Sequence, residues 1–254
     1  MKADYKNWMP KSMIWGFAAG TVVSLALTLV IGISWLKILL LVLALFLAGM
    51  TVWTVLMHRA FSYDGKRQMS RQIIDGVAAY VKLPKGGRCL DVGCGSGALA
   101  IAVAKRNPQG KVTGIDRWGA DYASFSKNLC ENNARAEGVD GVTDFEQGNA
   151  LKLDFPDDTF DAVTSNYVYH NIPSHDRQAI LMETLRVLKK GGTFAVHDLF
   201  SIQKYGDMQA FVKKLKDLGY EQVELISTDH GLFMSPWEAK WMGLAGSAIL
   251  VGKK

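Results

Sequence analysis

Glycines and carboxylates between residues 90 and 116 have the composition of a nucleotide-binding loop. The run LDVGCGSG (90–97) joins a short apolar segment to a helix-like one. Glycines let the backbone approach a ligand closely, and the start of a helix presents unpaired N–H groups. Asp116 ends the next apolar run, KVTGID, where a carboxylate can accept hydrogen bonds from ribose hydroxyls. This loop fits two classes of ligand, dinucleotides and S-adenosylmethionine. The alternative is that the glycines form a plain tight turn that binds no ligand.

Side chains that can hold or move a proton follow two later apolar runs. Ligands of open α/β sheets bind at the carboxyl ends of the strands, so these positions are suited to catalysis. An imidazole titrates near neutral pH, which makes either histidine a candidate general base. A loop histidine bonded to its neighbours is the alternative for His197, and a structural role is the alternative for His170. The catalytic candidates are Tyr167, His170, His197 and Asp198.

Apolar segments of strand length alternate with segments of helix length from residue 61 onward. Strands that alternate with helices predict a parallel sheet with helices on both faces. The last two strands have no convincing helix between them, which predicts an antiparallel pair at one edge. We expect strands at 88–92, 111–116, 142–147, 160–165, 193–198, 221–227 and 247–252, and helices at 65–81, 98–106, 120–137, 174–190 and 205–218. The expected fold class is α/β, a doubly wound, mostly parallel seven-stranded sheet with an antiparallel edge strand.

This part of the chain resembles the class I S-adenosylmethionine-dependent methyltransferases over nearly all of residues 61–252. The resemblance is carried, in this order, by LDVGCGSG (90–97), GID (114–116), QGNA (147–150), FPDDTFDAVTSNYVYHNI (155–172) and LKKGGTFAVHD (188–198). It implies a Rossmann-like fold, S-adenosyl-L-methionine as the cofactor and methyl transfer as the activity. A nicotinamide-dependent reductase and a catalytically silent cofactor-binding membrane module remain the alternatives.

The resemblance also implies where the cofactor would lie. The glycine loop would face its amino-acid part, Asp116 would bind the ribose, and Asn166 would border the methionine end. The family often has Asp where Asn149 stands beside the adenine, and an amide oxygen can still accept from the adenine amino group. Tyr63 would close over the cofactor, with a tyrosine at a membrane interface as the alternative. The cofactor-binding candidates are Tyr63, Asp91, Gly93, Cys94, Gly95, Gly97, Asp116, Arg117, Asn149, Ala150 and Asn166.

Residues 1–59 are expected to be a membrane anchor. The runs 13–35 and 38–57 carry no charge, and about 20 apolar residues span the hydrocarbon core as a helix. We expect two transmembrane helices there, with a turn at Leu36-Lys37, followed by a methyltransferase domain at 60–254. A re-entrant hairpin and a buried core hairpin are the alternatives. Basic residues before the first helix and after the second predict that both ends, and the catalytic domain, face the cytoplasm.

Composition and charge narrow the range of partners. Three cysteines without a C-x-x-C spacing predict neither a zinc site nor a disulfide framework, and no metal is expected. Much of the net charge of +5 gathers beside the apolar segments, where a membrane surface explains it better than a phosphate backbone. The stretch SNYV (165–168) stands where nucleic-acid amino-methyltransferases usually carry an Asn/Asp-Pro-Pro-aromatic motif. We therefore expect no nucleic acid, but a small lipophilic or lipid-like substrate and the lipid bilayer.

The segment 232–242 concentrates large apolar side chains between the last two expected strands. Phe233, Trp237 and Trp241 suit a boundary between apolar and polar surroundings, which predicts an entry side for a lipid-soluble acceptor. Core packing is the alternative. All motifs lie after Arg59, so a chain that starts near Phe61 is expected to fold and to bind the cofactor.

Overall fold

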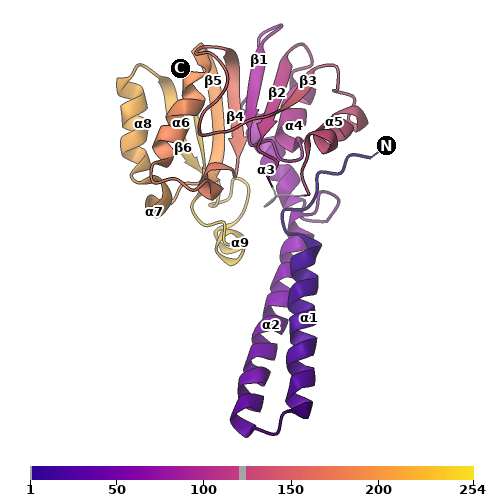
Figure 1. Cartoon of the computed structure of the whole chain (residues 1–254). Coiled ribbons are helices and arrows are strands. Elements are labelled where there is room, and N and C mark those ends of the chain that lie inside the picture. Colours follow the sequence, from indigo (N-terminus) through magenta and orange to yellow (C-terminus); the bar gives the residue numbers. More distant parts are fainter. Residues whose placement is uncertain (1, 120–123) are drawn as a thin grey trace. The chain divides into compact units, whose positions relative to one another are not determined.

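The computed structural model describes residues 2–119 and 124–254, which form a helical hairpin and a sheet flanked by helices (Figure 1). The chain divides into two compact units. One unit is Lys6–Arg71 and contains the hairpin, and the other joins the residues up to Tyr5 with Gln72–Lys254 and contains the sheet. The hairpin unit thus runs beyond residue 59, and the residues before Lys6 belong with the sheet.

The hairpin consists of α1 (Lys11–Val30) and α2 (Ser34–Phe61). Both helices are long and apolar enough to cross a membrane, by length and composition alone, and few of their residues are buried. The turn lies at residues 31–33, earlier than the expected break at Leu36-Lys37. Lys37 continues α2 because lysine is a good helix former, whereas Gly32 lies between two β-branched isoleucines with extended backbones.

The segment before α1 is bound to the last turns of α2. The Asn7 amide donates a hydrogen bond to the carbonyl of His58 (2.8 Å), and Nδ1 of His58 donates to the carbonyl of Met9 (2.7 Å). The rings of Trp8 and Phe61 lie 5.4 Å apart. These contacts hold the two ends of the hairpin together.

The second unit is built on a seven-stranded sheet with the order β3-β2-β1-β4-β5-β7-β6. The strands are β1 (Arg88–Val92), β2 (Lys111–Asp116), β3 (Thr143–Gln147), β4 (Phe160–Asn166), β5 (Leu188–Leu199), β6 (Glu221–Ser227) and β7 (Ser247–Lys253). Strands β1 to β5 pair in parallel, whereas β7 runs antiparallel to both β5 and β6. The expected α/β fold with a mostly parallel seven-stranded sheet is confirmed. The antiparallel strand is not the edge strand, because β6 pairs outside it.

Five of the helices after the hairpin correspond to the expected ones with shifted ends, whereas α7 and α9 were not expected. They are α3 (Met69–Ala78), α4 (Ala98–Arg106), α5 (Lys127–Ala136), α6 (Arg177–Arg186), α7 (Ile202–Tyr205), α8 (Met208–Asp217) and α9 (Pro236–Trp241). Four residues of the helix expected at 120–137, namely 120–123, lie outside the described residues. Asp176 rather than Ser174 caps α6, since its carboxylate accepts from the Ala179 N–H (2.9 Å). Gly191-Gly192 lie inside the long strand β5 instead of ending the helix.

Helix α9 lies between β6 and β7, where no helix was expected. Ser235 and Glu238 form a reciprocal capping box at its start, and Pro236 occupies its first position. These residues satisfy the first N–H groups of a helix, so the sequence did contain a start signal. The helix was missed because it is only six residues long and lacks an apolar period.

The sheet register brings the candidate residues to one edge. Asp91 of β1 lies opposite Gly114 of β2 and Thr164 of β4, and Asn166 of β4 lies opposite His197 of β5. Because these strands are parallel, their carboxyl ends meet at the same edge. The glycine loop and the catalytic candidates therefore start from neighbouring strand ends.

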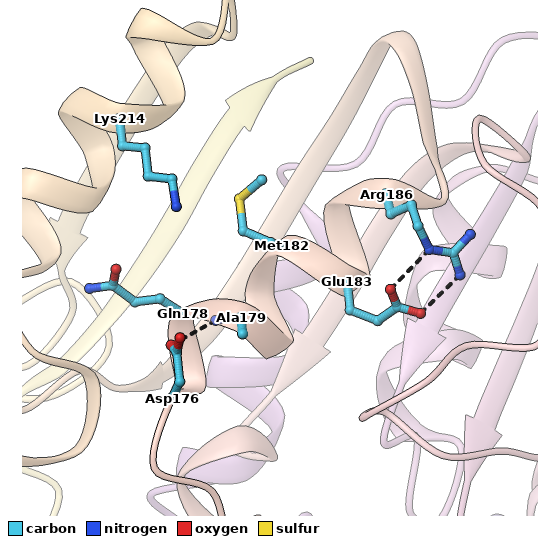
Figure 2. A pocket seen from close by; sticks show the side chains of 7 residues that line it. All are labelled: Asp176, Gln178, Ala179, Met182, Glu183, Arg186 and Lys214. Atoms are coloured by element: carbon cyan, nitrogen blue, oxygen red, sulfur yellow. Dashed lines mark hydrogen bonds and ion pairs between the residues drawn. The ribbon is translucent and has the colours of Figure 1, made fainter.

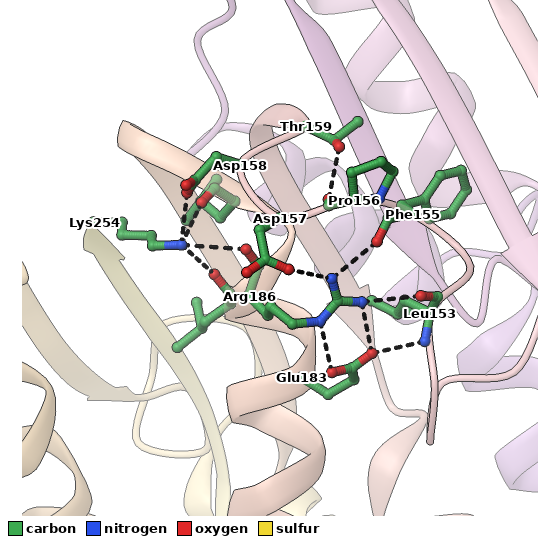
Figure 3. Close-up of polar contacts among 11 residues, drawn as sticks. Leu153, Phe155, Pro156, Asp157, Asp158, Thr159, Glu183, Arg186 and Lys254 are labelled. Atoms are coloured by element: carbon green, nitrogen blue, oxygen red, sulfur yellow. Dashed lines mark hydrogen bonds and ion pairs between the residues drawn. The ribbon is translucent and has the colours of Figure 1, made fainter.

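Arg186 fastens the loop before β4 to the end of α6 (Figure 3). Its guanidinium donates to the carbonyls of Leu153 and Phe155, both at 2.9 Å, and pairs with the carboxylates of Glu183 and Asp157. Glu183 in turn accepts from the Leu153 N–H (2.8 Å). The loop that leads from β3 to β4 is thus held by the paired side chains of Arg186 and Glu183.

Replacing Arg186 by Met should lower the free energy of unfolding by about 2–4 kcal/mol, since hydrogen bonds to a charged group contribute about 1.5–3 kcal/mol each before solvent screening. Thermal unfolding of the full chain in detergent measures this as a lower Tm. Arg135→Met is the matched control, because Arg135 is an exposed helix-terminal arginine whose guanidinium donates to Asn132 of the same helix. Equal Tm values for the two variants would contradict the assigned role.

Candidate functional site

The glycine loop between β1 and α4 adopts a backbone conformation that strongly favours glycine. Gly93, Gly95 and Gly97 have φ values of 75°, 56° and 82°, in the left-handed region. The Gly93 N–H donates to the carbonyl of Ile115 (2.8 Å), which joins the loop to β2. A Cβ at Gly93 would lie 2.4 Å from the Val168 side chain, so the loop packs directly against the segment after β4.

Asp116, the last residue of β2, is hydrogen-bonded to the glycine loop. One carboxylate oxygen accepts from the Gly95 N–H (2.9 Å), and the other accepts from the Trp118 N–H (2.9 Å). The indole N–H of Trp118 donates to the carbonyl of Gly95 (3.0 Å). Each oxygen of a carboxylate has two lone pairs, so Asp116 retains acceptor capacity for a ligand. No motif in the sequence pointed to Trp118.

Asp91 is the buried carboxylate beneath this loop. One of its oxygens accepts from the Thr164 hydroxyl (2.9 Å), while the other is buried without a hydrogen-bond partner among the described residues. Burial raises the pKa of Asp91 to about 7. This oxygen lies beneath a loop of the type that binds nucleosides. Because it lacks a hydrogen-bond donor there, it fits a ligand that carries an ammonium group.

The adenine-side candidates follow β3. Asn149 is exposed, and its side-chain oxygen accepts from the Leu151 N–H (3.0 Å) within its own turn. Ala150 is half-buried against the apolar core. Arg117 is exposed, and its carbonyl accepts from the Gln147 amide (3.2 Å). These three residues lie at the ends of β2 and β3, next to Asp116.

Cys94 and Tyr63 complete the set of cofactor-binding candidates. Cys94 is a buried free cysteine, and burial raises the pKa of its thiol well above the usual range. The Cys94 side chain packs against Gly114, because a Cβ added at Gly114 would lie 3.0 Å from the Cys94 sulfur. Tyr63 belongs to the hairpin unit, just after α2, and its part in the site stays a prediction.

His197 lies in the interior as a neutral, fully bonded imidazole. Nδ1 is 2.8 Å from the side-chain oxygen of Asn166, and Nε2 is 2.8 Å from the hydroxyl of Thr228. Because the amide oxygen only accepts, Nδ1 carries the proton and Nε2 accepts from Thr228. Burial lowers the pKa of His197 to about 3. Both nitrogens are occupied, so the geometry suits positioning of Asn166 rather than proton transfer.

The folded-state pKa of His197 lies below that of an unfolded histidine, so the unfolded chain binds more protons between pH 3 and about 6.5. Stability should therefore fall on acidification through this window, at about 1.4 kcal/mol per pH unit at most. The Tm difference between pH 7 and pH 5 should be smaller in His197→Gln than in the wild type. Parallel Tm curves for the two proteins would show that His197 does not titrate in this way.

Asp198 is a buried carboxylate that orients His170. It accepts from the N–H groups of Tyr169 (2.8 Å) and Leu199 (2.6 Å) and from Nδ1 of His170 (2.5 Å). These donors hold the pKa of Asp198 below its usual range despite burial. With Nδ1 donating to a carboxylate, the lone pair of neutral His170 lies on Nε2. The side chain of His170 is 14% exposed, whereas that of Asp198 is fully buried.

Tyr167 lies between the two histidines in a strained conformation. Its φ of 55° is left-handed, a region that costs a non-glycine residue about 1–3 kcal/mol. Its ring centre is 4.6 Å from that of His197 and 6.1 Å from that of His170. The hydroxyl is 2.7 Å from that of Ser247, and burial raises the pKa of Tyr167 above its usual range. Tyr167 thus stays protonated at neutral pH.

The segment 232–242 is divided between core and surface. Phe233 is only 9% exposed and its ring lies 5.4 Å from that of His197, so it packs in the core. A Cβ at Gly76 would lie 2.3 Å from the Phe233 ring. Trp237 is 70% exposed and stacks on Trp241, with ring centres 5.7 Å apart. The expectation that Phe233 faces acceptor or lipid is therefore wrong in this conformation, because it fills the space beside a glycine.

The structure brings the candidates into two adjoining groups. Asp91, Asp116 and the glycines form one, and the residues at the ends of β4 and β5 form the other; Val168 joins them by packing on Gly93. Sequence reasoning missed the partners that fix their orientation, which come from distant segments and follow no motif: Trp118, Asn133, Thr164, Thr228 and Ser247. Among the residues described, no three His, Cys, Asp or Glu side chains gather as a metal site.

Two cavities lie elsewhere on this unit. One of about 450 Å³ lies between α6 and α8, and Figure 2 shows its lining. Its acidic side chains are engaged locally, Glu183 with Arg186 and Asp176 with the Ala179 N–H. The other, of about 350 Å³, borders α5 and β3. Neither cavity is lined by a residue of the candidate site.

Comparison with known proteins shows what the chain is similar to. A family model described as a methyltransferase domain matches residues 83–244. The 27-O-demethylrifamycin SV methyltransferase of Amycolatopsis mediterranei is 30% identical over 184 residues, which cover 70% of this chain and 64% of that protein. The demethylmenaquinone methyltransferase of Geobacillus kaustophilus is 38% identical over 122 residues, 46% of this chain and 47% of that protein. The matches thus span about half to two thirds of these relatives.

A solved structure supports the fold alone. The crystal structure of the [4+2]-cyclase SpnF superposes with a TM-score of 0.55 at 23% identity and covers 74% of this chain and 82% of that chain. That protein is named as a cyclase, so the same fold hosts more than one reaction. The chemistry of this chain must be argued from its own residues.

Proposed function

Because the chain belongs to the methyltransferase domain family, we propose that it transfers a methyl group from S-adenosyl-L-methionine to a small lipophilic acceptor at a membrane. S-adenosyl-L-methionine is the cofactor of this family, as the motifs predict, and the nicotinamide-dependent alternative has no support. One observation carries the proposal. The glycine loop, which is bonded to Asp116, and the hydrogen-bonded Asp198 and His170 lie at the same carboxyl-terminal edge of the sheet.

The residues beside the glycine loop fit the cofactor. When bound, it supplies an electrophilic methyl group on a sulfonium. Gly95 leaves the loop backbone accessible, since among the described residues beyond its chain neighbours the nearest atom to the place of a Cβ there is 3.9 Å away, in Phe125. The unpartnered oxygen of Asp91 suits an ammonium group, and the spare lone pairs of Asp116 suit ribose hydroxyls. We assign Asn149 and Ala150 to the adenine side and Asn166 to the methionine end.

His170 is the proposed general base for an acceptor that must lose a proton. Asp198 holds the Nδ1 proton, fixes the ring and stabilises the imidazolium that forms when Nε2 takes a proton. His197 positions Asn166, since it is neutral and bonded at both nitrogens. The protonated Tyr167 hydroxyl, bonded to Ser247, contributes to the wall beside His170.

Three observations support a lipophilic acceptor and a bilayer. The helices α1 and α2 expose long apolar surfaces, which water solvates poorly. Lysines precede α1, and basic residues follow α2, which supports a spanning hairpin with a cytoplasmic catalytic unit. The two relatives above are named for a demethylmenaquinone and a demethylrifamycin, which are small organic acceptors rather than nucleic acids.

The experiment uses the full chain in lipid nanodiscs with methyl-labelled S-adenosyl-L-methionine. Demethylated quinones, phenols, thiols and phospholipids serve as acceptors, and S-adenosylhomocysteine is the product measured. We expect turnover with at least one lipid-soluble acceptor and none with tRNA or DNA. Tight cofactor binding without turnover on any acceptor would favour the catalytically silent module, and a rearranged product without methyl loss would favour a cyclase-like activity.

Trp237→Ser should raise the KM for a lipid-soluble acceptor several-fold, because Trp237 is 70% exposed and its ring stacks on that of the half-buried Trp241. Cofactor affinity should stay at the wild-type value. Leu218→Ser is the control, since Leu218 is also exposed but lies before the start of β6, whereas segment 232–242 follows the end of that strand. An equal rise in KM for a water-soluble acceptor would contradict an entry role for Trp237.

A further inference from the structure

Residues before the hairpin are part of the sheet-containing unit. The backbone of Asp4 pairs with the side chain of Asn133 on α5: its N–H donates to the amide oxygen (2.7 Å), and its carbonyl accepts from the amide nitrogen (3.0 Å). Asn133 is only 2% exposed. One buried side chain therefore binds the main chain of a segment that precedes it by more than a hundred residues.

The same segment is bound to the glycine loop. The amide nitrogen of Asn133 also donates to the carbonyl of Ser96 (2.9 Å), and the Ser96 hydroxyl donates to the carbonyl of Tyr5 (2.9 Å). Ser96 lies between Gly95 and Gly97, whose left-handed backbones shape the loop. Segment 2–5 and the loop are thus joined by two separate routes.

The next residues of the chain belong to the other unit. Asn7 and Met9 are bonded to His58 near the end of α2, as described above. A short stretch of chain is therefore fastened at one end to the glycine loop and at the other end to the hairpin.

We propose that residues 2–5 form a strap that holds the glycine loop in its cofactor-binding conformation, with Asn133 as the positioning residue. Glycine-rich loops lose the most conformational freedom on ordering, so a loop that is fixed beforehand binds its ligand at a lower entropic cost. This proposal rests on the proposed function, because the ligand of the loop is the cofactor. It revises the expectation that a chain starting near Phe61 binds the cofactor, since such a chain lacks the strap.

The test compares four variants of the full chain in detergent by calorimetric titration with S-adenosylhomocysteine. Asn133→Ala and deletion of residues 2–5 should each weaken binding by about tenfold or more, and Ser96→Ala by less, since each lost hydrogen bond is worth a few-fold to tenfold. Asn132→Ala is the matched control, because the side chain of the neighbouring Asn132 accepts a hydrogen bond from Arg135 of the same helix. It should bind within twofold of the wild type.

Hydrogen exchange at the amides of residues 95–97, measured without cofactor, gives a second readout. Exchange should be faster in the deletion variant and in Asn133→Ala, and unchanged in Asn132→Ala. If the wild type binds no S-adenosylhomocysteine, the proposed function fails, but the exchange data still test the strap. Wild-type affinity and wild-type exchange in the deletion variant would overturn the strap alone. The deletion leaves Asn133 in place, so it remains informative if Asn133→Ala does not fold.

Discussion

Replacing His170 by Gln should lower kcat about 10²–10⁴-fold, the usual contribution of a general base. Glutamine is similar in size and can still donate to Asp198, but it has no nitrogen that accepts a proton. The affinity for S-adenosylhomocysteine should remain near the wild-type value, because His170 lies in the strand-end group rather than in the glycine loop. Initial rates with the best acceptor, together with calorimetric titration, separate the two effects.

Two further variants sharpen this test. Asp198→Asn removes the charge that stabilises the imidazolium, and its single amide oxygen can accept on only one of the two sides that now bind the Tyr169 and Leu199 N–H groups. It should therefore show the same fall in kcat and a changed pH–rate profile. His175→Gln is the control, since His175 is an exposed histidine five residues further on. Full activity of His170→Gln on an acceptor that must be deprotonated would remove the base role from His170.

Asp116→Ala should weaken the binding of S-adenosylhomocysteine about tenfold to a hundredfold, because a charge-assisted hydrogen bond contributes about 1.5–3 kcal/mol. The structure adds a second cause, since Asp116 also accepts from the Gly95 and Trp118 N–H groups and so shapes the loop. Calorimetry on the full chain measures the affinity, and hydrogen exchange at Gly95 measures the loop.

The control for this change is Asp144→Ala, which removes an exposed carboxylate from the neighbouring strand β3. Asp116→Asn distinguishes the two causes, because the amide oxygen can accept only one of the two loop hydrogen bonds and carries no charge. Unchanged affinity in Asp116→Ala would exclude Asp116 from the cofactor site, whatever the state of the loop.

The strands and the glycine loop could be predicted because their signals are local. An apolar run that ends in LDVGCGSG or in GID specifies both a strand and the chemistry at its end. The hairpin turn lies earlier in the chain than the charge of Lys37 predicts, because lysine has a high helix propensity and continues α2. Gly32 between two isoleucines is the better signal for the turn. Helix α9 had a capping box, Ser235 with Glu238, but no apolar period to draw attention to it.

The different roles of His170 and His197 could not be read from the sequence. Both follow apolar strands, and both residue types suit a base. Their difference comes from partners that are distant in the sequence. Thr228 donates a hydrogen bond to the second nitrogen of His197, whereas Asp198 binds one nitrogen of His170. Tertiary contacts of this kind decide which imidazole is buried and which keeps a free lone pair.

The pairing of segment 2–5 with Asn133 and Ser96 sets an order of events during synthesis. A ribosome makes the strap first, then α1 and α2, and only much later the residues that the strap must find. The strap can therefore form its contacts only after the whole hairpin, β1, β2 and α5 have been made. If α1 and α2 enter the membrane as they are made, the strap and the glycine loop pair only after the hairpin has reached the bilayer.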